Sequence, residues 1–307
     1  MTAQHPRHAS RRPRVVGITV PIGLLFTAAA SLVALAAVPV ASGVDDLPAP
    51  AAAMMLPDVH VAAERAADPC ADEQVRAALA DGDDAATVRA FGGGEAFRAA
   101  VAAGNAPCIS LSDPARTWVV VNKLRPLRPE SYAPASLIGA AVASTTRSNE
   151  LRPVATAALD AMAAAARDAG AGVLGINNGY RSYAVQVRTY GTHVRNKGAE
   201  GADAVSARPG FSEHQSGLAF DLVACAPSCG DLDSFGPSPQ GRWVAENAWR
   251  YGFIVRYEAG RTAVTGYSPE PWHIRYIGPE LAEVYHQGGH HTLEEFFGLP
   301  PAPDYSH

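Results

Sequence analysis

Two short motifs that lie far apart in the chain place the strongest constraint on how it can fold. The first is SEHQSGLAFD, residues 212–221, and the second is EPWH, residues 270–273. Together they supply two imidazoles and two carboxylates. Two imidazoles and one carboxylate can hold a metal ion with a coordination position left open, and a second carboxylate beside it can move protons. The fold must therefore bring both segments to one point.

The candidate metal ligands are His214, Asp221 and His273. A turn at Gly217, where no side chain hinders a tight backbone, would let His214 and Asp221 converge, and Ala219 leaves room beside them. Taken alone, the pair also fits a histidine and an aspartate that are hydrogen-bonded in a core. Likewise, His273 alone fits a packed core histidine beside Trp272.

Glu270 is the candidate general base. Pro269 and Pro271 flank it and restrict its backbone, so the carboxylate is held in place. A carboxylate beside an activated water can take the water's proton and later deliver it to a leaving amine. The alternative interpretation is a surface carboxylate in a turn.

A third cluster is GYRSY, residues 179–183, with Gln186 shortly after it. It lies at a predicted strand-to-helix junction, where Ser182 can cap the helix and Gln186 can lie one turn further on the same face. Arg181 could bind a carboxylate through two hydrogen bonds or stabilise an oxyanion. Without the other motifs, a surface salt bridge and a capping serine would explain this cluster equally well.

The N-terminus has the features of an export signal. Arginines precede a long apolar run from Val15 to about Val40, which is followed by small residues and then by Asp45 and Asp46. The run is long enough to span a membrane, and its end would also suit cleavage by a signal peptidase, so both interpretations stay open. Either way, we expect the rest of the chain to be exported to the cell envelope or beyond.

The net charge of −5 argues against a nucleic-acid partner, because such a protein would need a basic face. The cysteines are Cys70, Cys108, Cys225 and Cys229. An even number in an exported chain indicates disulfides, and of the three possible pairings we favour the local one, 70 with 108 and 225 with 229. A metal site that uses Cys225 and Cys229 is the alternative.

Hydrophobic periodicity predicts helices within residues 72–103 and over residues 153–170, 182–197, 241–251 and 293–297. Strands are predicted at residues 173–176, 253–257 and 273–277, and Trp118–Val121 is a further β-rich run. We therefore expect an α+β fold, with helices packed on a small, mainly antiparallel sheet. A short helical segment and an N-terminal apolar export or anchor helix would precede it.

Taken together, the three motifs resemble the zinc D-alanyl-D-alanine carboxypeptidases of the VanY type, whose fold is shared with D,D-dipeptidases and hedgehog signalling domains. The resemblance covers roughly residues 117–279 and includes the tripeptide Val121–Lys123, followed by Pro126 and Leu127. It implies one zinc ion per chain, held by His214, Asp221 and His273, with Glu270 as the base. Arg181 would polarise the scissile carbonyl or stabilise the oxyanion.

The resemblance further implies that Ser182, Gln186 and Ser212 contact the substrate and that Trp272 shapes the pocket. The substrate would be a peptidoglycan stem peptide that ends in D-Ala-D-Ala, and the protein is expected to be a monomer. The predicted organisation is a signal peptide or membrane anchor (1–43), an Ala/Pro-rich linker (44–68), a small disulfide-stapled helical segment (69–115), a zinc peptidase domain (116–300) and a tail (301–307).

Several alternatives remain within and outside this assignment. A serine enzyme for the same reaction would need Ser-x-x-Lys and Lys-Thr-Gly motifs, and the sequence contains neither. An L,D-carboxypeptidase or an endopeptidase of the same fold would carry the same motifs, because the difference lies in the shape of the pocket. A wall-binding module that keeps zinc without turnover is the alternative from another class, and the presence of Glu270 argues against it.

Overall fold

The computed structural model describes residues 68–146 and 148–305. The predicted N-terminal apolar helix and nearly all of the predicted linker lie outside these residues, so they remain predictions. Within the described residues, no helix is both long enough and apolar enough to cross a membrane.

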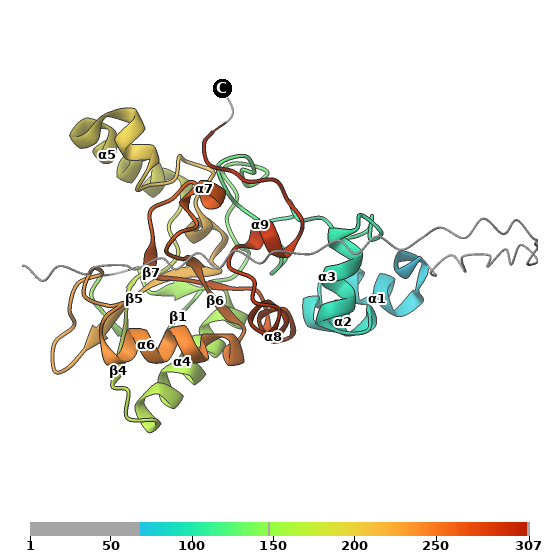
Figure 1. The fold of residues 1–307 in the computed structure, drawn as a ribbon, viewed down its shortest axis with the longest axis horizontal. Helices are drawn as coiled ribbons and strands as arrows, with labels where there is room; N and C mark the ends of the chain where they lie inside the picture. The colour runs from blue at the N-terminus through green and yellow to red at the C-terminus, as the bar shows by residue number, and fades with distance from the viewer. Residues whose placement is uncertain (1–67, 147, 306–307) are drawn as a thin grey trace, which may run out of the picture. The chain divides into compact units, whose positions relative to one another are not determined.

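A five-stranded sheet forms the centre of the fold (Figure 1). Its strands lie in the order β2-β4-β5-β7-β6, and all pairs are antiparallel except β2 with β4. A separate pair, β1 with β3, is antiparallel. The predicted α+β fold with a mainly antiparallel sheet is therefore confirmed. The strands are β1 (Ile138–Gly139), β2 (Ala143–Ser144), β3 (Glu150–Leu151), β4 (Val173–Asn178), β5 (Ala219–Cys225), β6 (Phe253–Tyr257) and β7 (Glu270–Tyr276).

The described residues also form α-helices and three short 3-10 helices. The α-helices are α1 (Glu73–Asp81), α2 (Asp84–Ala90), α3 (Gly94–Ala102), α4 (Pro153–Asp168), α5 (Tyr183–Asp203), α6 (Pro239–Asn247), α7 (Thr262–Thr265), α8 (Pro279–Gln287) and α9 (Leu293–Phe296). The 3-10 turns are η1 (Pro69–Ala71), η2 (Glu213–Ser216) and η3 (Ala248–Tyr251).

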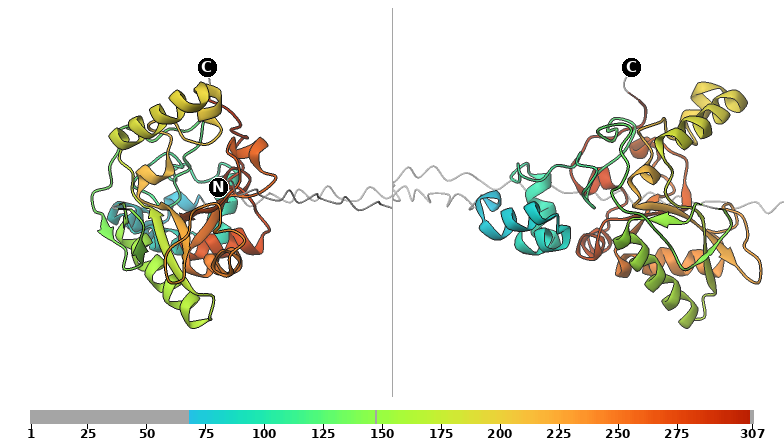
Figure 2. Two further views of the ribbon diagram at one scale, coloured as in Figure 1. Left: turned by 90° about the vertical axis from the view of Figure 1, so that its left-hand side faces the viewer. Right: turned by 180° about the vertical axis from the view of Figure 1, so that it is seen from behind.

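Helix α5 begins where the sequence predicts and ends later. Its first turn is capped by Ser182, whose hydroxyl accepts a hydrogen bond from the amide of Val185. Gly198, which directly follows the predicted end of the helix, adopts a left-handed φ of 75° and kinks the helix, which then continues to Asp203. In Figures 1 and 2 this helix extends away from the sheet.

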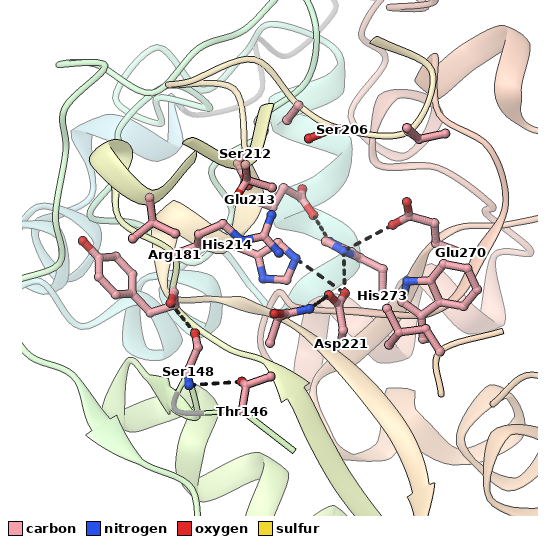
Figure 3. A pocket seen from close by; sticks show the side chains of 18 of the residues that line it. Thr146, Ser148, Arg181, Ser206, Ser212, Glu213, His214, Asp221, Glu270 and His273 are labelled. Carbon is pink, nitrogen blue, oxygen red and sulfur yellow. Dashed lines mark hydrogen bonds and ion pairs between the residues drawn. The ribbon is translucent and has the colours of Figure 1, made fainter. Parts of the chain in front are cut away.

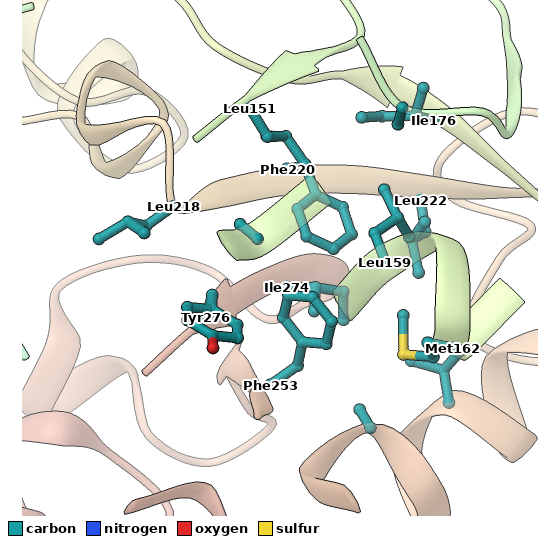
Figure 4. Packing of buried hydrophobic residues seen from close by; sticks show 14 of the residues in the cluster. Leu151, Leu159, Met162, Ile176, Leu218, Phe220, Leu222, Phe253, Ile274 and Tyr276 are labelled. Atoms are coloured by element: carbon teal, nitrogen blue, oxygen red, sulfur yellow. The ribbon is translucent and has the colours of Figure 1, made fainter. Parts of the chain in front are cut away.

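The main hydrophobic core lies between one face of the sheet and helices α4 and α6 (Figure 1). Leu159 and Met162 of α4 are fully buried with Phe220, Leu222 and Ile274 of the central strands (Figure 4). Successive strand residues point to opposite faces. Because Phe220, Leu222 and Ile274 point into this core, Asp221 and His273 point to the other face of the sheet.

A second core joins the helices α1–α3 to α8 and α9 (Figure 2). Val75 and Phe97 pack with Leu281 and Phe296, and all four are almost completely buried. A disulfide links Cys70 to Cys108 at the edge of this core, and a second one links Cys225 to Cys229. Both bridges follow the local pairing that we favoured, so Cys225 and Cys229 do not form a metal site.

The β-rich run Trp118–Val121 is buried but joins neither sheet. The guanidinium of Arg275 donates hydrogen bonds to the carbonyls of Thr117 and Val119. A neighbouring strand would need these same carbonyls as acceptors. High strand propensity at this position therefore reflects burial of the side chains and not membership of a sheet.

The turn between η2 and β5 depends on Gly217. Its φ is 70°, in the left-handed region, and a Cβ there would lie 3.1–3.2 Å from side-chain atoms of Arg152, Leu137 and Pro134. The predicted tight backbone at this glycine is therefore present, and it returns the chain from His214 to the strand that carries Asp221.

The disulfide that brackets α1–α3 should contribute strongly to stability. Its cysteines are 38 residues apart, so its removal from a Cys70→Ala/Cys108→Ala protein should lower the free energy of unfolding by about 3–4 kcal/mol. Urea unfolding followed by tryptophan fluorescence measures this. The matched control is Cys225→Ala/Cys229→Ala, whose separation is 4 residues and whose loss should be smaller. An unchanged urea midpoint in the first protein would contradict the prediction.

Gly217→Ala should destabilise the fold through both backbone strain and crowding, by about 2–4 kcal/mol in total. Gly82→Ala is a matched control, because Gly82 has nearly the same φ of 72° and its added Cβ would meet no atom within 4 Å. That variant should lose only about 1–2 kcal/mol. Thermal unfolding of the two proteins separates the cost of backbone strain from the cost of crowding. Equal losses of stability in the two variants would show that crowding at Gly217 is relieved without penalty.

Candidate metal centre

The structure brings the three predicted ligands together. One ligating atom from each of His214, Asp221 and His273 lies within 4.8 Å of the others, and all three residues are buried. The Asp221 Oδ1 atom is 3.5 Å from His214 Nε2 and 3.3 Å from His273 Nδ1 (Figure 3). This spacing leaves room for a small cation between the three atoms.

Strand pairing explains why two of these residues meet. Asp221 and His273 are direct partners in the antiparallel ladder between β5 and β7, so their side chains stand next to each other on one face. His214 reaches the same point from η2, and Gly217 ends that turn. The motif spacing thus follows from one 3-10 turn and one strand pair.

Two irregularities in the sheet direct further side chains toward the same point. Between the pairs Val255↔Ile274 and Tyr257↔Glu270, strand β7 contains extra residues, so Glu270 faces the site together with His273. In regular pleating, residues three apart would point to opposite faces. A second irregularity, in β4, sets Asn178 opposite Asp221. Such bulges commonly redirect a side chain next to an active site.

Each of the three ligand side chains is also held at its other polar atom. His214 Nδ1 lies 2.9 Å from the carbonyl of Gly179, and His273 Nε2 lies 3.3 Å from Glu213 Oε2. The amide of Asn178 donates to Asp221 Oδ2 at 2.9 Å. Metal-bound histidines and carboxylates typically have such partners, which fix the ring and the free lone pair. The donor set and its partners therefore fit a metal ion.

Asn178 and Glu213 were not predicted from the sequence to be part of the site. Glu213 lies inside the first motif, next to His214, and it is completely buried. Its Oε1 atom accepts hydrogen bonds from Arg256 and Arg275, which are also completely buried. A charged residue directly before a candidate ligand was the available signal, but the arginines that neutralise it come from the distant strands β6 and β7.

The charges at the centre are strongly coupled. Burial lowers the pKa of His214, which favours the neutral ring that a metal requires. Burial acts in the same direction on His273, but hydrogen bonds to Asp221 and Glu213 outweigh it and raise its pKa to about 9. The two carboxylates therefore create a field that favours positive charge at this point.

Glu270 lies beside this centre at the start of β7, with its Oε2 atom 3.6 Å from His273 Nδ1. Burial, aided by the charge of Asp221, raises the pKa of Glu270 to about 7 against the opposing charge of His273. A group with a pKa near neutrality can both accept and release a proton under physiological conditions. Glu270 therefore has the position and the acidity of a general acid–base.

Arg181 lies next to His214 at the same cavity (Figure 3). Its backbone amide donates to the carbonyl of His214 at 3.2 Å, and one guanidinium nitrogen donates to Gln186 Oε1 at 3.0 Å. Burial lowers the pKa of Arg181, with Asp221 and Glu270 opposing this, but guanidinium remains charged in proteins. Arg181 is the one arginine or lysine among the described residues that line the cavity.

Gln186 has a different position from the one expected. It is completely buried, and its amide nitrogen donates to the carbonyl of Ala207 at 2.6 Å and to Ser206 Oγ at 3.3 Å. It does not belong to the described lining of the cavity. Because its amide is fully used in holding Arg181 and the 206–207 segment, the expectation of direct substrate contact is not supported.

The cavity that contains these groups has a volume of about 710 Å³. Ser182, Ser212 and Trp272 line it, as expected for residues near a substrate, and so do Tyr257 and Tyr267. Binding cavities for small molecules and short peptides commonly have a volume of about 300–1,000 Å³. The cavity is therefore large enough for the end of a peptide.

Comparisons with known proteins agree with this geometry. Residues 148–279 match the family model VanY, described as D-alanyl-D-alanine carboxypeptidase. The putative carboxypeptidase YodJ of Bacillus subtilis (strain 168) is 36% identical over 61% of this chain and 69% of its own length. A D-alanyl-D-alanine carboxypeptidase of Enterococcus faecium is 43% identical, over 34% of this chain and 29% of that protein.

A solved structure supports the same relationship. The LdcB LD-carboxypeptidase structure, described as revealing the basis of peptidoglycan recognition, superposes with a TM-score of 0.56 at 37% identity. The match covers 60% of this chain and 86% of that chain. From the family model, the relatives and the fold, we conclude that this chain belongs to the VanY-type D-alanyl-D-alanine carboxypeptidase family.

Proposed function

We propose that the protein is a zinc-dependent D,D-carboxypeptidase that removes the terminal D-alanine from peptidoglycan stem peptides or their precursors. One observation carries the proposal: His214, Asp221 and His273 converge, and Glu270 lies 3.6 Å from one of them. Membership of the carboxypeptidase family supports the reaction class.

The donor set favours zinc as the metal. Two imidazole nitrogens and one carboxylate oxygen are a common protein ligand set for catalytic zinc, with the remaining position open. His214 would use Nε2, His273 would use Nδ1 and Asp221 would use Oδ1, because the other polar atom of each is engaged elsewhere. When bound, zinc supplies Lewis acidity, which activates water and polarises a carbonyl.

The residues around the metal centre would transfer the proton and stabilise the developing charge. Glu270 takes a proton from the attacking water and delivers it to the nitrogen of the departing D-alanine, so no net proton is gained or lost by the side chain. Arg181 lies on the His214 side, where its fixed positive charge stabilises the negative charge that develops on the carbonyl oxygen. Gln186 keeps the guanidinium in that orientation.

Ser182, Ser212 and Trp272 line the cavity and are proposed to contact the terminal residue of the substrate. We also propose an exported location, which the apolar N-terminal run of the sequence supports. In that location the chain would meet the cell wall, either anchored in the membrane by that segment or released as a monomer after cleavage.

Three other functions use the same site. An L,D-carboxypeptidase acting on tetrapeptides is supported by the likeness to the LdcB LD-carboxypeptidase structure. An endopeptidase would cut inside the stem. A zinc-bearing wall-binding module would hold the peptide without turnover, and Glu270 beside the metal centre argues against it.

The substrate and the metal can be tested in one experiment. The purified protein is incubated with a pentapeptide stem ending in D-Ala-D-Ala and, separately, with the tetrapeptide. Free D-alanine is then quantified. We expect release from the pentapeptide, loss of release after treatment with a chelator, and recovery on addition of one equivalent of zinc.

Each other outcome identifies an alternative. Release from the tetrapeptide alone would indicate an L,D-carboxypeptidase, and internal fragments would indicate an endopeptidase. Zinc and peptide binding with no product of any kind would indicate the wall-binding module. Full activity in the presence of a chelator that has removed all metal would refute zinc catalysis.

Glu270→Gln should separate metal binding from catalysis. The amide has nearly the same shape as the carboxylate but cannot accept the proton, so D-alanine release should fall by roughly 10²–10⁴-fold. Zinc content, measured by elemental analysis, should stay at one per chain, because Glu270 is not needed as a ligand. Glu283→Gln, an exposed glutamate of α8, is the matched control and should retain full activity. Release at the wild-type rate by the Glu270→Gln protein would refute the proposed role.

A further inference from the structure

We infer that Lys123 is a positioning residue that holds the turn leading to Glu270. Lys123 belongs to the tripeptide Val121–Lys123, to which neither the metal centre nor the proposed mechanism gives a role. The inference rests on the proposed function to the extent that Glu270 acts as the base.

Lys123 is a buried cation with fixed acceptors. Lys123 is only 3% exposed. Its Nζ atom donates hydrogen bonds to the carbonyl of Gly266 at 2.7 Å and to that of Pro303 at 3.2 Å. The same Nζ atom lies 5.0 Å from the centre of the Tyr267 ring and 5.5 Å from that of Tyr305. Cation–π attraction at such distances is strengthened when the cation is removed from water.

These contacts join two segments that are distant in sequence. Gly266 and Tyr267 follow α7 and lead, through Ser268 and Pro269, to Glu270. Pro303 and Tyr305 belong to the C-terminal segment. The ammonium therefore lies where the turn before Glu270 and the C-terminal segment meet.

The turn and the C-terminal segment are packed tightly together around this lysine. Gly266 has a left-handed φ of 79°, and a Cβ there would lie 2.6 Å from the Pro303 carbonyl oxygen and 2.8 Å from Lys123 Cδ. The amide of Ala302 donates to the carbonyl of Val264 at 2.7 Å. Without the ammonium, the carbonyls of Gly266 and Pro303 would lose their shared donor, and the turn would lose one of its restraints.

The path from this turn to the cavity is short. Tyr267 is buried, lines the cavity, and its hydroxyl lies 3.1 Å from that of Tyr305. Its ring also packs against Tyr257, at 4.9 Å between centres, and Tyr257 is the ladder partner of Glu270. A shift of the turn would therefore move a wall of the cavity and the strand start that carries the base.

The metal ligands are held by a separate set of residues. Asn122, the neighbour of Lys123, donates to Glu294, which pairs with Arg256, and Arg256 in turn pairs with Glu213 beside His273. Lys123 takes no part in these hydrogen bonds. Its loss should therefore disturb the base and leave zinc affinity nearly unchanged, which a general loss of structure would not do.

The test compares Lys123→Met with Lys197→Met. Methionine keeps the apolar length of the side chain and removes the ammonium, and Lys197 is the other lysine of the chain, exposed on α5. In the metal-free proteins, hydrogen exchange of the amides in residues 264–270 and 302–305 should be faster in the Lys123→Met protein and unchanged in the Lys197→Met protein. In the zinc-loaded proteins, kcat per folded molecule should fall by roughly 10–100-fold for Lys123→Met, with zinc Kd within about twofold of wild type.

Each result decides the inference. Unchanged exchange in residues 264–270, or a lower thermal midpoint with unchanged kcat, would show that Lys123 is merely structural and would overturn the positioning role. If the wild type releases no D-alanine, the proposed function fails, and the exchange measurement still decides whether Lys123 holds the turn.

A measurement on the wild-type protein covers the case in which Lys123→Met does not fold. Under native conditions an amine-acylating reagent should modify Lys197 at least about tenfold faster than Lys123, because a buried, hydrogen-bonded ammonium is not available to it. Equal rates at the two lysines, read by peptide mass spectrometry, would show that Lys123 is not anchored and would overturn the inference.

Discussion

The molecule is organised around one carboxylate oxygen, Oδ1 of Asp221, which lies within 3.5 Å of a nitrogen from each of two histidines. Removing such a group from water is unfavourable unless opposite charge compensates it. The central strands place it against His273, the 3-10 turn of residues 213–216 adds His214, and Asn178 occupies its second oxygen. The surrounding strands therefore hold this buried charge in one fixed geometry.

A second buried charge, that of Glu213, supports the first. Its carboxylate lies between Arg256, Arg275 and the far nitrogen of His273, and all of these groups are shielded from solvent. Buried ion pairs often add little net stability, because desolvation offsets their attraction. Their value here lies in orientation. Arg275 also donates hydrogen bonds to the carbonyls of Thr117 and Val119, so a single network fixes the ring of His273 and the segment that contains Thr117 and Val119.

The sequence was informative where chemistry requires particular residue types and uninformative where geometry depends on distant partners. The convergence of His214, Asp221 and His273 near Glu270, the helix start at Ser182 and the mainly antiparallel sheet could all be inferred, because motifs, caps and periodicity are local signals. The bulges in β4 and β7 have no such signal, since an extra residue is defined only relative to the opposite strand. For the same reason, the burial of Gln186 behind Arg181 and the exclusion of Trp118–Val121 from the sheet could not be anticipated.

The helices α1–α3 share their hydrophobic core with α8 and α9, and Gly94 makes this contact especially close, because a Cβ there would lie 2.5 Å from the carbonyl oxygen of Glu280. Residues near both ends of the described chain thus enclose one interior. Any attempt to transplant the peptidase onto another protein has to carry this N-terminal piece along. The fusion junction of such a chimera belongs ahead of Pro69, because a junction placed after α3 would leave α8 without its cover.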